Sequence, residues 1–475
     1  MNYIKYCDKI VSEFYFWGNI MLKKINDNYI FEEIVVLLLA FIGLIFWYYR
    51  LIYGITSLLV IGSLLAIVFN DFKYMAPATI FSIFTLGEGI SPDAHPIPLF
   101  IAAGVAIISM VIFTIRNGFN IKKIKSAKGL LLLSVLSILP LFWHNIIKPE
   151  NNVMYILYFA YLIYFIVYVF FVINLNDKSF RMICLTFSYL AIILFFECFL
   201  TVYNMHLERP GVNILSFAYF LGWGVCNEAG IMLCFSMPFI AILLLKAEDL
   251  PHIIINVLKS ALLMFGIIFT TSRGSYLFGA IMAVALFILI MIFAKHKIKI
   301  LITSLITLCV SILIFYFAFD KIDLPKFIND VKDFVFYNKF DDNGRKDLWN
   351  MATNIWKQNF LTITFGNGIV AEYYNANSAT GYREVFVVYH STFYEALATV
   401  GIIGVIALLI HFIEKYLMLF KFELSVALVM LFGYLILDIY GMIDNTYGMY
   451  YFMGPLVISM ASIDNLSKKQ ELIFN

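Results

Sequence analysis

Residues 271–294 read TSRGSYLFGAIMAVALFILIMIFA, and this stretch decides the class of fold. From Gly274 onward it contains no charged residue, and it is as long as the roughly 20 apolar residues that a helix needs to cross a bilayer. Arg273 stands directly before the run, and another long apolar segment precedes it. An arginine beside hydrocarbon is costly, so it indicates either a function or an anchor at the membrane surface. The stretch therefore predicts a transmembrane helix with a charged residue at one end.

The composition extends this prediction to the whole chain of 475 residues. Hydrophobic residues make up 62% and charged residues 13%, whereas an ordinary soluble domain is about half apolar and a quarter charged. The mean hydropathy is +0.89. The formal net charge is only +2 and no segment forms a basic domain, so nucleic acid is excluded as an expected partner. The six cysteines form no C-x-x-C pair, and we interpret them as small buried apolar residues.

Long apolar runs recur along the chain and predict an all-α integral membrane protein with about 14 transmembrane helices, in a range of roughly 11 to 14. Glycines and prolines interrupt several runs, which membrane helices tolerate where neighbouring helices satisfy the backbone. The predicted spans are 31–49, 51–69, 74–88, 97–115, 129–147, 153–173, 182–203, 225–245, 252–270, 274–294, 298–319, 393–413, 423–441 and 447–463.

The distribution of Lys and Arg predicts the orientation, because cytoplasmic loops carry an excess of positive charge. With residues 1–30 in the cytoplasm as a retained interfacial segment, the cytoplasmic segments hold twenty Lys and Arg residues. The short outer turns hold only four, which are Arg50, Lys148, Arg209 and Arg273. The predicted organisation is an interfacial segment (1–30), eleven helices (31–319), one large extracytoplasmic loop (320–392), three further helices (393–463) and a cytoplasmic tail (464–475).

The large loop is predicted to contain two amphipathic helices, because apolar residues recur at helical spacing in 326–340 and again in 345–360. Such helices would lie on the membrane surface or cap the bundle. The turn Gly366-Asn367-Gly368 and the polar run NANSATG at 375–381 are typical of connecting segments.

Three residues at the outer ends of predicted elements could carry chemistry. Arg273 could bind phosphate through two parallel hydrogen bonds, or it could anchor its helix at the interface. Arg345 begins the second loop helix and could do the same, or it could be a solvated loop charge. His390 precedes the span at 393–413, where a neutral imidazole could take a proton from a hydroxyl group. The alternative for His390 is an interfacial histidine hydrogen-bonded to backbone.

Other polar residues at outer helix ends are weaker candidates. Glu88, Arg209, Glu228 and Asp444 could line a cavity, although a structural role is the more usual one for such residues. Asp341 and Asp342 could hold a divalent metal beside a diphosphate. Adjacent acids before a helix are more often charges that interact with the helix N-terminus, so no metal site is expected.

Taken in order, these residues resemble the O-antigen ligase and polymerase family of bacterial membrane glycosyltransferases. The similarity covers roughly residues 210–410 and departs from the family at Ser391, where an asparagine is usual. The matching motifs are Asn227 with the apolar stretch to Pro238, Thr271-Ser272-Arg273-Gly274, Gly344-Arg345 with Trp349, Phe365-Gly366-Asn367-Gly368, and His390-Ser391 with Gly401-Ile402-Ile403-Gly404.

The resemblance implies a fold like that of C-type membrane glycosyltransferases and an active site on the outer face of the bacterial cytoplasmic membrane. It implies a donor glycan linked through diphosphate to undecaprenol, a sugar hydroxyl acceptor and inversion at the transferred sugar. Arg273 and Arg345 would then stabilise the departing diphosphate, and His390 would be the base. It implies no cofactor and no metal, and it allows association with other proteins of polysaccharide assembly in the lipid bilayer.

Three functions remain open from the sequence. The first is a polymerase of lipid-linked repeat units, which makes O-antigen, capsule or exopolysaccharide. The second is an O-antigen ligase that transfers finished glycan to a lipid-A core or another acceptor. The third, from another class, is a lipid-linked oligosaccharide flippase, but the candidate residues gather at one face and no matched broken helices indicate a transporter. Richness in Ile, Asn, Lys and Phe is typical of an AT-rich genome and slightly favours the polymerase.

Overall fold

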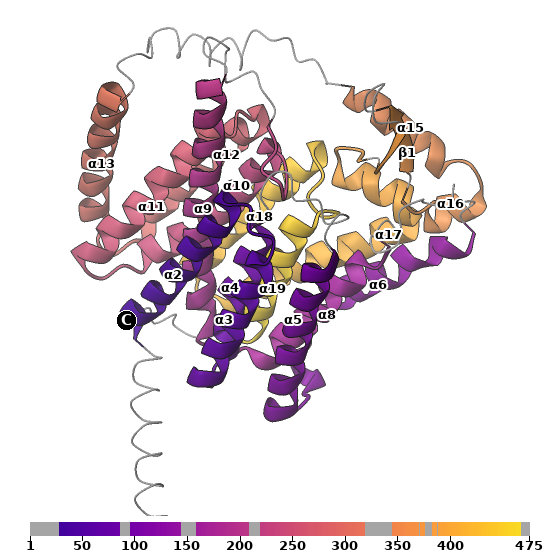
Figure 1. Cartoon of the computed structure of the whole chain (residues 1–475), viewed down its shortest axis with the longest axis horizontal. Helices are drawn as coiled ribbons and strands as arrows, with labels where there is room; N and C mark the ends of the chain where they lie inside the picture. Colours follow the sequence, from indigo (N-terminus) through magenta and orange to yellow (C-terminus); the bar gives the residue numbers. More distant parts are fainter. Residues whose placement is uncertain are drawn as a thin grey trace, which may run out of the picture.

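The computed structural model describes residues 28–85, 96–143, 158–208, 219–318, 344–369, 371–375, 382–386 and 388–466. The described part is helical except for one short hairpin (Figure 1). The predicted segment 1–30 apart from its last three residues, Glu88, Arg209, the predicted loop helix 326–340, Asp341, Asp342, residues 376–381 and the tail beyond Leu466 lie outside these ranges.

The first helices form one half of the bundle. They are α2 (Tyr29–Tyr48), α3 (Gly54–Phe69), η1 (Phe72–Tyr74), α4 (Met75–Ile83), α5 (Pro96–Asn117), η2 (Ile121–Lys123), α6 (Lys128–Ile138), η3 (Leu139–Phe142), α8 (Ala160–Asn174) and α9 (Ser179–Glu208).

The remaining helices complete the bundle and frame the loop. They are α10 (Cys226–Leu245), α11 (Leu250–Phe269), α12 (Arg273–Phe293), α13 (Lys297–Ala318), α15 (Arg345–Trp356), α16 (Phe360–Phe365), α17 (Thr392–Leu417), η6 (Met418–Lys421), α18 (Leu424–Ile443) and α19 (Tyr450–Asp464).

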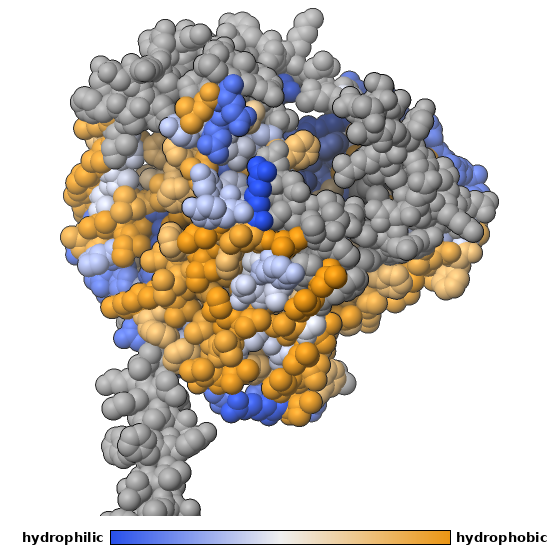
Figure 2. Space-filling view, in the orientation of Figure 1, coloured by the Kyte–Doolittle hydropathy of each residue, from blue (hydrophilic) through white to orange (hydrophobic). Residues whose placement is uncertain are grey.

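The membrane class predicted from the sequence is confirmed. Seven helices of the described part are long and apolar enough to cross a membrane, and shorter apolar helices accompany them. Large hydrophobic side chains are exposed along the outside of the bundle, where Figure 2 shows broad hydrophobic surfaces. In a membrane protein these side chains face lipid, which removes the cost that water would impose on them.

One predicted span is only partly described. Within residues 74–85, the described part of the run at 74–88, the α-helix is the nine-residue α4, which covers less than half of the roughly 30 Å hydrocarbon at about 1.5 Å per residue. Helix α4 is buried against α2, α3 and α9 instead. Hydropathy could not distinguish the two outcomes, because a helix buried inside a membrane protein and a helix facing lipid are equally apolar.

Helix α10 lies at the centre of the fold. Nearly all of its residues are buried, and it packs against α9, α11, α12 and α18. Close approach depends on small residues, as in other membrane helix pairs. A Cβ atom on Gly433 of α18 would come within 2.7 Å of Pro238 in α10, and one on Gly230 of α10 would come within 1.7 Å of the Ser275 hydroxyl on α12.

Two ends of the bundle differ in their polar side chains. Helix α18 begins after Glu423 and ends before Asp444, so about 30 Å of helix separates these two residues. We call the Glu423 end the ion-pair face. Its buried or half-buried pairs are Glu32 with Lys73 and Arg181, Glu33 with Lys259, Glu423 with Lys246, and Asp464 with Lys421.

The opposite end, which we call the loop face, carries the described part of residues 320–392. The helix predicted at 345–360 is present as α15, with α16 following it, and both pack against α17 at one edge of the bundle (Figure 1). The hairpin of β1 (Ala371–Asn375) and β2 (Tyr382–Phe386) was not predicted. Its register pairs Ala371 with Phe386 and Asn375 with Tyr382.

Candidate functional site

His390, Arg345 and Asp444 meet at the loop face. The Nδ1 atom of His390 lies 3.2 Å from one carboxylate oxygen of Asp444, and the Nη2 atom of Arg345 lies 3.9 Å from the other. The exposed fractions of the side chains are 43% for His390, 29% for Arg345 and 10% for Asp444. A buried carboxylate therefore lies beneath two partly exposed cationic or basic side chains, which leaves both able to reach a ligand.

The carboxylate determines the role of each ring nitrogen of His390. An ionised carboxylate only accepts hydrogen bonds, so the Nδ1 atom of His390 must be the donor in this contact. In a neutral imidazole the proton on Nδ1 leaves a lone pair on Nε2. Asp444 thus selects the tautomer in which the Nε2 atom of this partly exposed side chain can accept a proton.

The backbone directly before His390 is held by two hydrogen bonds. The backbone N–H of Tyr389 donates to Glu395 of α17 at 3.2 Å, and its carbonyl accepts from the indole of Trp349 at 3.1 Å. The Trp349 ring also stacks on Tyr394, with ring centroids 5.2 Å apart. Helix α15, which begins at Arg345, is therefore attached to the segment that carries His390.

His390 itself has a backbone φ of 49°, in the left-handed region. Histidine adopts this region more readily than most residues, but the conformation is uncommon and has to be maintained by its surroundings. The neighbouring Thr392 supplies part of that support, because its hydroxyl lies 3.2 Å from the Thr446 hydroxyl and accepts from the Thr446 backbone N–H at 3.2 Å. These contacts join the start of α17 to the segment that follows Asp444.

Asp444 is positioned by the end of α18. It is the C-cap residue, and its backbone N–H donates to the carbonyl of Tyr440. Its Oδ1 atom accepts a second hydrogen bond, at 2.9 Å, from the backbone N–H of Asn445. The carboxylate is therefore oriented by its own backbone as well as by His390.

Arg273 is the first residue of α12, and its helix end packs against the same part of α18. A Cβ atom on Gly274 would come within 2.8 Å of the Tyr440 ring, so only glycine permits this approach. The Tyr440 hydroxyl lies 3.4 Å from the Ser272 hydroxyl and 3.1 Å from the Ser275 hydroxyl. Since Asp444 follows Tyr440 by one helical turn, the half-buried Arg273 begins its helix beside the end of α18 that holds Arg345 and His390.

The residue two positions before Arg273 is also in an unusual conformation. Thr271 has a φ of 53°, which is rare for a β-branched residue and costs about 1–2 kcal/mol. The Ser272 side chain then caps α12 by accepting from the Ser275 backbone N–H. Two of the four non-glycine residues with positive φ in the described part, Thr271 and His390, are therefore the first residues of two motifs at this site.

The glycine motifs of the loop and of α17 meet in space. Helix α17 breaks at Gly401, where φ is 67° and ψ is −166°. The backbone N–H groups of Asn367 and Gly368 donate to the carbonyls of Ala398 and Thr399 just before this break. A Cβ atom on Gly366 would come within 2.3 Å of the Thr399 backbone. The predicted connecting turn is thus a docking element that attaches the loop to a membrane helix.

The other sequence candidates are placed as follows. Glu228 caps the first turn of α10 by accepting from the Val225 backbone N–H at 2.8 Å, and Asn227 precedes it in the same turn. Ser391 is the buried N-cap residue of α17. Among the described residues no group of three or more His, Cys, Asp or Glu side chains could hold a metal ion.

Asp444 was undervalued by the sequence interpretation, which treated it only as a residue that could line a cavity. Its partner His390 is 54 positions away, and no spacing rule connects them. The signal that could have pointed to it is an acid directly after the apolar run of α18, on the same predicted side as His390.

The fold and this site define a polytopic helical membrane protein with a group of basic side chains around a buried carboxylate at one face. Residues 259–409 match the family model described as O-antigen ligase. The match supports an assignment to the O-antigen ligase/polymerase family, as the motifs indicated, and it includes Arg273, Arg345 and His390 but ends before Asp444. No curated protein matches the chain.

Proposed function

We propose that this protein is a membrane glycosyltransferase that polymerises undecaprenyl-diphosphate-linked oligosaccharide units on the extracytoplasmic side of the bacterial cytoplasmic membrane. The observation that carries the proposal is the contact of His390 and Arg345 with opposite oxygens of the buried Asp444. It brings a candidate base and a candidate phosphate ligand to one place beside the start of α12. The family match supports an activity of the ligase or polymerase type.

In the proposed reaction His390 is the base. The Nε2 atom takes the proton from an acceptor hydroxyl while its oxygen forms a bond to the anomeric carbon of the donor sugar. The bond from that carbon to the diphosphate oxygen breaks, and undecaprenyl diphosphate leaves with the electron pair. One displacement of this kind inverts the anomeric configuration. Asp444 stabilises the imidazolium that forms, because the carboxylate stays ionised next to the new positive charge.

Arg345 and Arg273 bind the diphosphate in this proposal. A guanidinium presents a planar fork that matches two phosphate oxygens, and it stays protonated in the protein. Negative charge grows on the diphosphate as it leaves, so preorganised arginines stabilise the transition state more than the ground state. The separation of 3.9 Å between Arg345 and Asp444 exceeds a normal hydrogen bond, which leaves the donors of Arg345 available to a ligand.

The second candidate is a ligase, because the matching family model is described as O-antigen ligase. Both activities use the same donor chemistry and differ in the acceptor. A polymerase uses a lipid-linked unit as the acceptor as well, whereas a ligase needs a different one. The sequence is rich in Ile, Asn, Lys and Phe. This composition is typical of an AT-rich genome and supports our choice of the polymerase.

An activity assay with the purified full-length protein in nanodiscs distinguishes a polymerase from a ligase. Given only undecaprenyl-diphosphate repeat units, a polymerase makes a ladder of longer lipid-linked chains. The His390→Ala variant, prepared in the same nanodiscs and checked for a monodisperse size-exclusion profile, should make none. A wild-type protein that makes no ladder but transfers glycan once a lipid core is added would be a ligase, and our choice would be wrong.

A further inference from the structure

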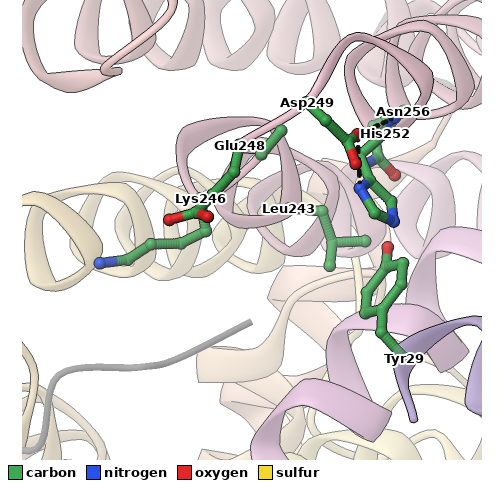
Figure 3. A pocket seen from close by; sticks show the side chains of 8 residues that line it. Tyr29, Leu243, Lys246, Glu248, Asp249, His252 and Asn256 are labelled. Carbon is green, nitrogen blue, oxygen red and sulfur yellow. Dashed lines mark hydrogen bonds and ion pairs between the residues drawn. The ribbon is translucent and has the colours of Figure 1, made fainter. Parts of the chain in front are cut away.

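A cavity of about 260 Å³ opens on the ion-pair face, at the end of the bundle opposite His390 (Figure 3). It lies where α2 begins, α10 ends and α11 begins. These three helices are all long and apolar enough to cross a membrane, so the cavity lies at the level of lipid headgroups. Its lining residues are Tyr29, Leu243, Lys246, Ala247, Glu248, Asp249, His252 and Asn256.

The size of the cavity limits its ligand. Pockets for drug-sized molecules measure roughly 300–1,000 Å³, and this one is smaller. It is too small for an oligosaccharide unit and is far from the loop face, so it is separate from the site proposed for glycan transfer. A single headgroup or another small polar molecule matches its volume.

Asn256 supplies the strongest indication of a ligand. Its side chain is 1% exposed, and its Oδ1 atom has no hydrogen-bond partner in the described part of the chain. The carbonyl oxygen of Asn256 is left as a buried acceptor in the cavity wall, and such an atom is costly unless a donor meets it.

The other polar groups of the cavity are acceptors too. The Nδ1 atom of His252 lies 2.6 Å from Asp249, whose carboxylate also accepts from the His252 backbone N–H. In neutral His252 the Nε2 atom is therefore an acceptor, and Figure 3 shows the Tyr29 hydroxyl pointing towards this ring. Glu248 adds an exposed carboxylate. The lysine of the cavity, Lys246, is held 2.6 Å from Glu423 and extends away from these groups.

We propose that this cavity binds a primary ammonium group, carried by the ethanolamine-type headgroup of a membrane phospholipid. An ammonium has three donors and no acceptor, which complements the Asn256 carbonyl oxygen, the His252 nitrogen and the Asp249 carboxylate. Its positive charge complements the acids of the rim. The membrane is the source because three membrane-crossing helices end around the cavity, whose apolar wall includes Leu243.

The test is lipid binding by the full-length protein, measured by native mass spectrometry. Phosphatidylethanolamine is compared with phosphatidylcholine of the same acyl chains, since the trimethylammonium of the latter has no N–H donor. We expect a preference for phosphatidylethanolamine of about tenfold, which corresponds to about 1.4 kcal/mol. Asn256→Leu and Asp249→Asn should abolish this preference. Asparagine is also a good N-cap, so Asp249→Asn keeps the start of α11 intact.

Asp177→Asn is the matched control, because it removes an exposed carboxylate that does not line the cavity. Asp177 lies between α8 and α9, and its neighbour Asn176 donates a hydrogen bond to Asp71. It should leave the preference unchanged. Equal binding of both lipids by the wild type, or a preference that survives in Asn256→Leu and Asp249→Asn, overturns the proposal. Millimolar ethanolamine or spermidine that displaces the lipid through the same two residues would assign the site to a soluble amine, and the headgroup source would be wrong.

Discussion

The indole of Trp349 on α15 donates a hydrogen bond to the carbonyl of Tyr389, the residue directly before His390. Arg345, one turn earlier on the same helix, contacts Asp444, which contacts His390 in turn. The loop helix α15, the start of α17 and the end of α18 are therefore each connected to the other two by contacts around the candidate site. Displacement of α15 would move the proposed base and one proposed phosphate ligand together.

Trp349→Phe tests this attachment. The phenyl ring keeps the stack on Tyr394 but loses the hydrogen bond to Tyr389, and a net hydrogen bond contributes about 1 kcal/mol. We expect transfer activity to fall by about fivefold. The matched control is Trp356→Phe on the same helix, whose indole donates to Ile363 and not to the His390 segment. Equal losses in both variants would show that α15 acts only through its general stability.

Asp444→Asn tests the tautomer of His390. The amide can present an N–H group to Nδ1, which would favour the tautomer with the proton on Nε2 and remove the base. We expect activity to fall by roughly 10²-fold or more, the usual size of a general-base contribution. The decisive comparison is with Asp444→Ala, which favours neither tautomer. If asparagine, the closer match in shape, preserves more activity than alanine, the carboxylate acts only by filling space.

Arg273→Lys and Arg345→Lys test the two-bond recognition of diphosphate. Lysine keeps the positive charge and loses the planar fork, so each variant should weaken donor use by roughly tenfold or more. The loss should appear in the KM for the lipid-linked donor and in kcat, with little change in the KM for an added acceptor. Full activity of both variants would mean that a point charge is sufficient.

Gly274→Ala tests the approach of α12 to α18. The added methyl group would overlap the Tyr440 ring, which is buried and stacked on Phe278, so it has no room to move. Overpacking of this kind typically costs about 1–3 kcal/mol, and the shift would carry Arg273 away from the end of α18. We expect a large loss of activity with the protein still inserted in the membrane. Gly104→Ala in α5, where a Cβ atom meets nothing within 4 Å, should be unaffected.

A buried ion pair beneath the site gives a prediction about stability. The Lys415 ammonium donates to both oxygens of Asp438 at 2.6 and 2.8 Å, and Tyr447 also contacts both side chains. The Tyr447 hydroxyl accepts from the Lys415 ammonium and donates to Asp438, so the pair lies in a buried hydrogen-bond network. Breaking one side of a buried pair costs about 3–5 kcal/mol.

Lys415→Met should therefore lower the thermal unfolding midpoint strongly, and the double variant Lys415→Met/Asp438→Asn should recover part of the loss. The partly exposed pair Lys246–Glu423 serves as the control, because ion pairs that solvent reaches contribute only about 0–1 kcal/mol. A double variant less stable than either single variant would contradict the account of an uncompensated buried charge.

Local patterns predicted much of this structure. The apolar run after Arg273 is the helix α12, and Arg345 begins the predicted loop helix. Both depend on residues close together in the chain. The contact of His390 with Asp444 depends instead on how α17 and α18 pack, and neither sequence segment contains that information. The position of His390 before a predicted span and the motif similarity both suggested it as a base, whereas Asp444 belonged to none of the quoted motifs.

The hairpin and the short helix α4 show two further limits of prediction from the sequence. Strands β1 and β2 contain Tyr, Val and Phe, which favour strands, but the polar run between them masked the pairing. The α4 segment is apolar enough for a span, and its length as a helix is set by packing against α2, α3 and α9. In both cases the missing information was tertiary.

The docking of Gly366 and Gly368 onto the break at Gly401 has a consequence for chimaeric proteins. Cut points at residues 320 and 392 would separate the loop from the helix carbonyls that bind it, and a foreign α17 without the same break would meet the Gly366 turn with a steric clash. A chimaera that takes its donor or acceptor specificity from a relative therefore has to exchange α16, the Gly366 turn and the first half of α17 together. The C-terminal cut point has to lie beyond Gly404.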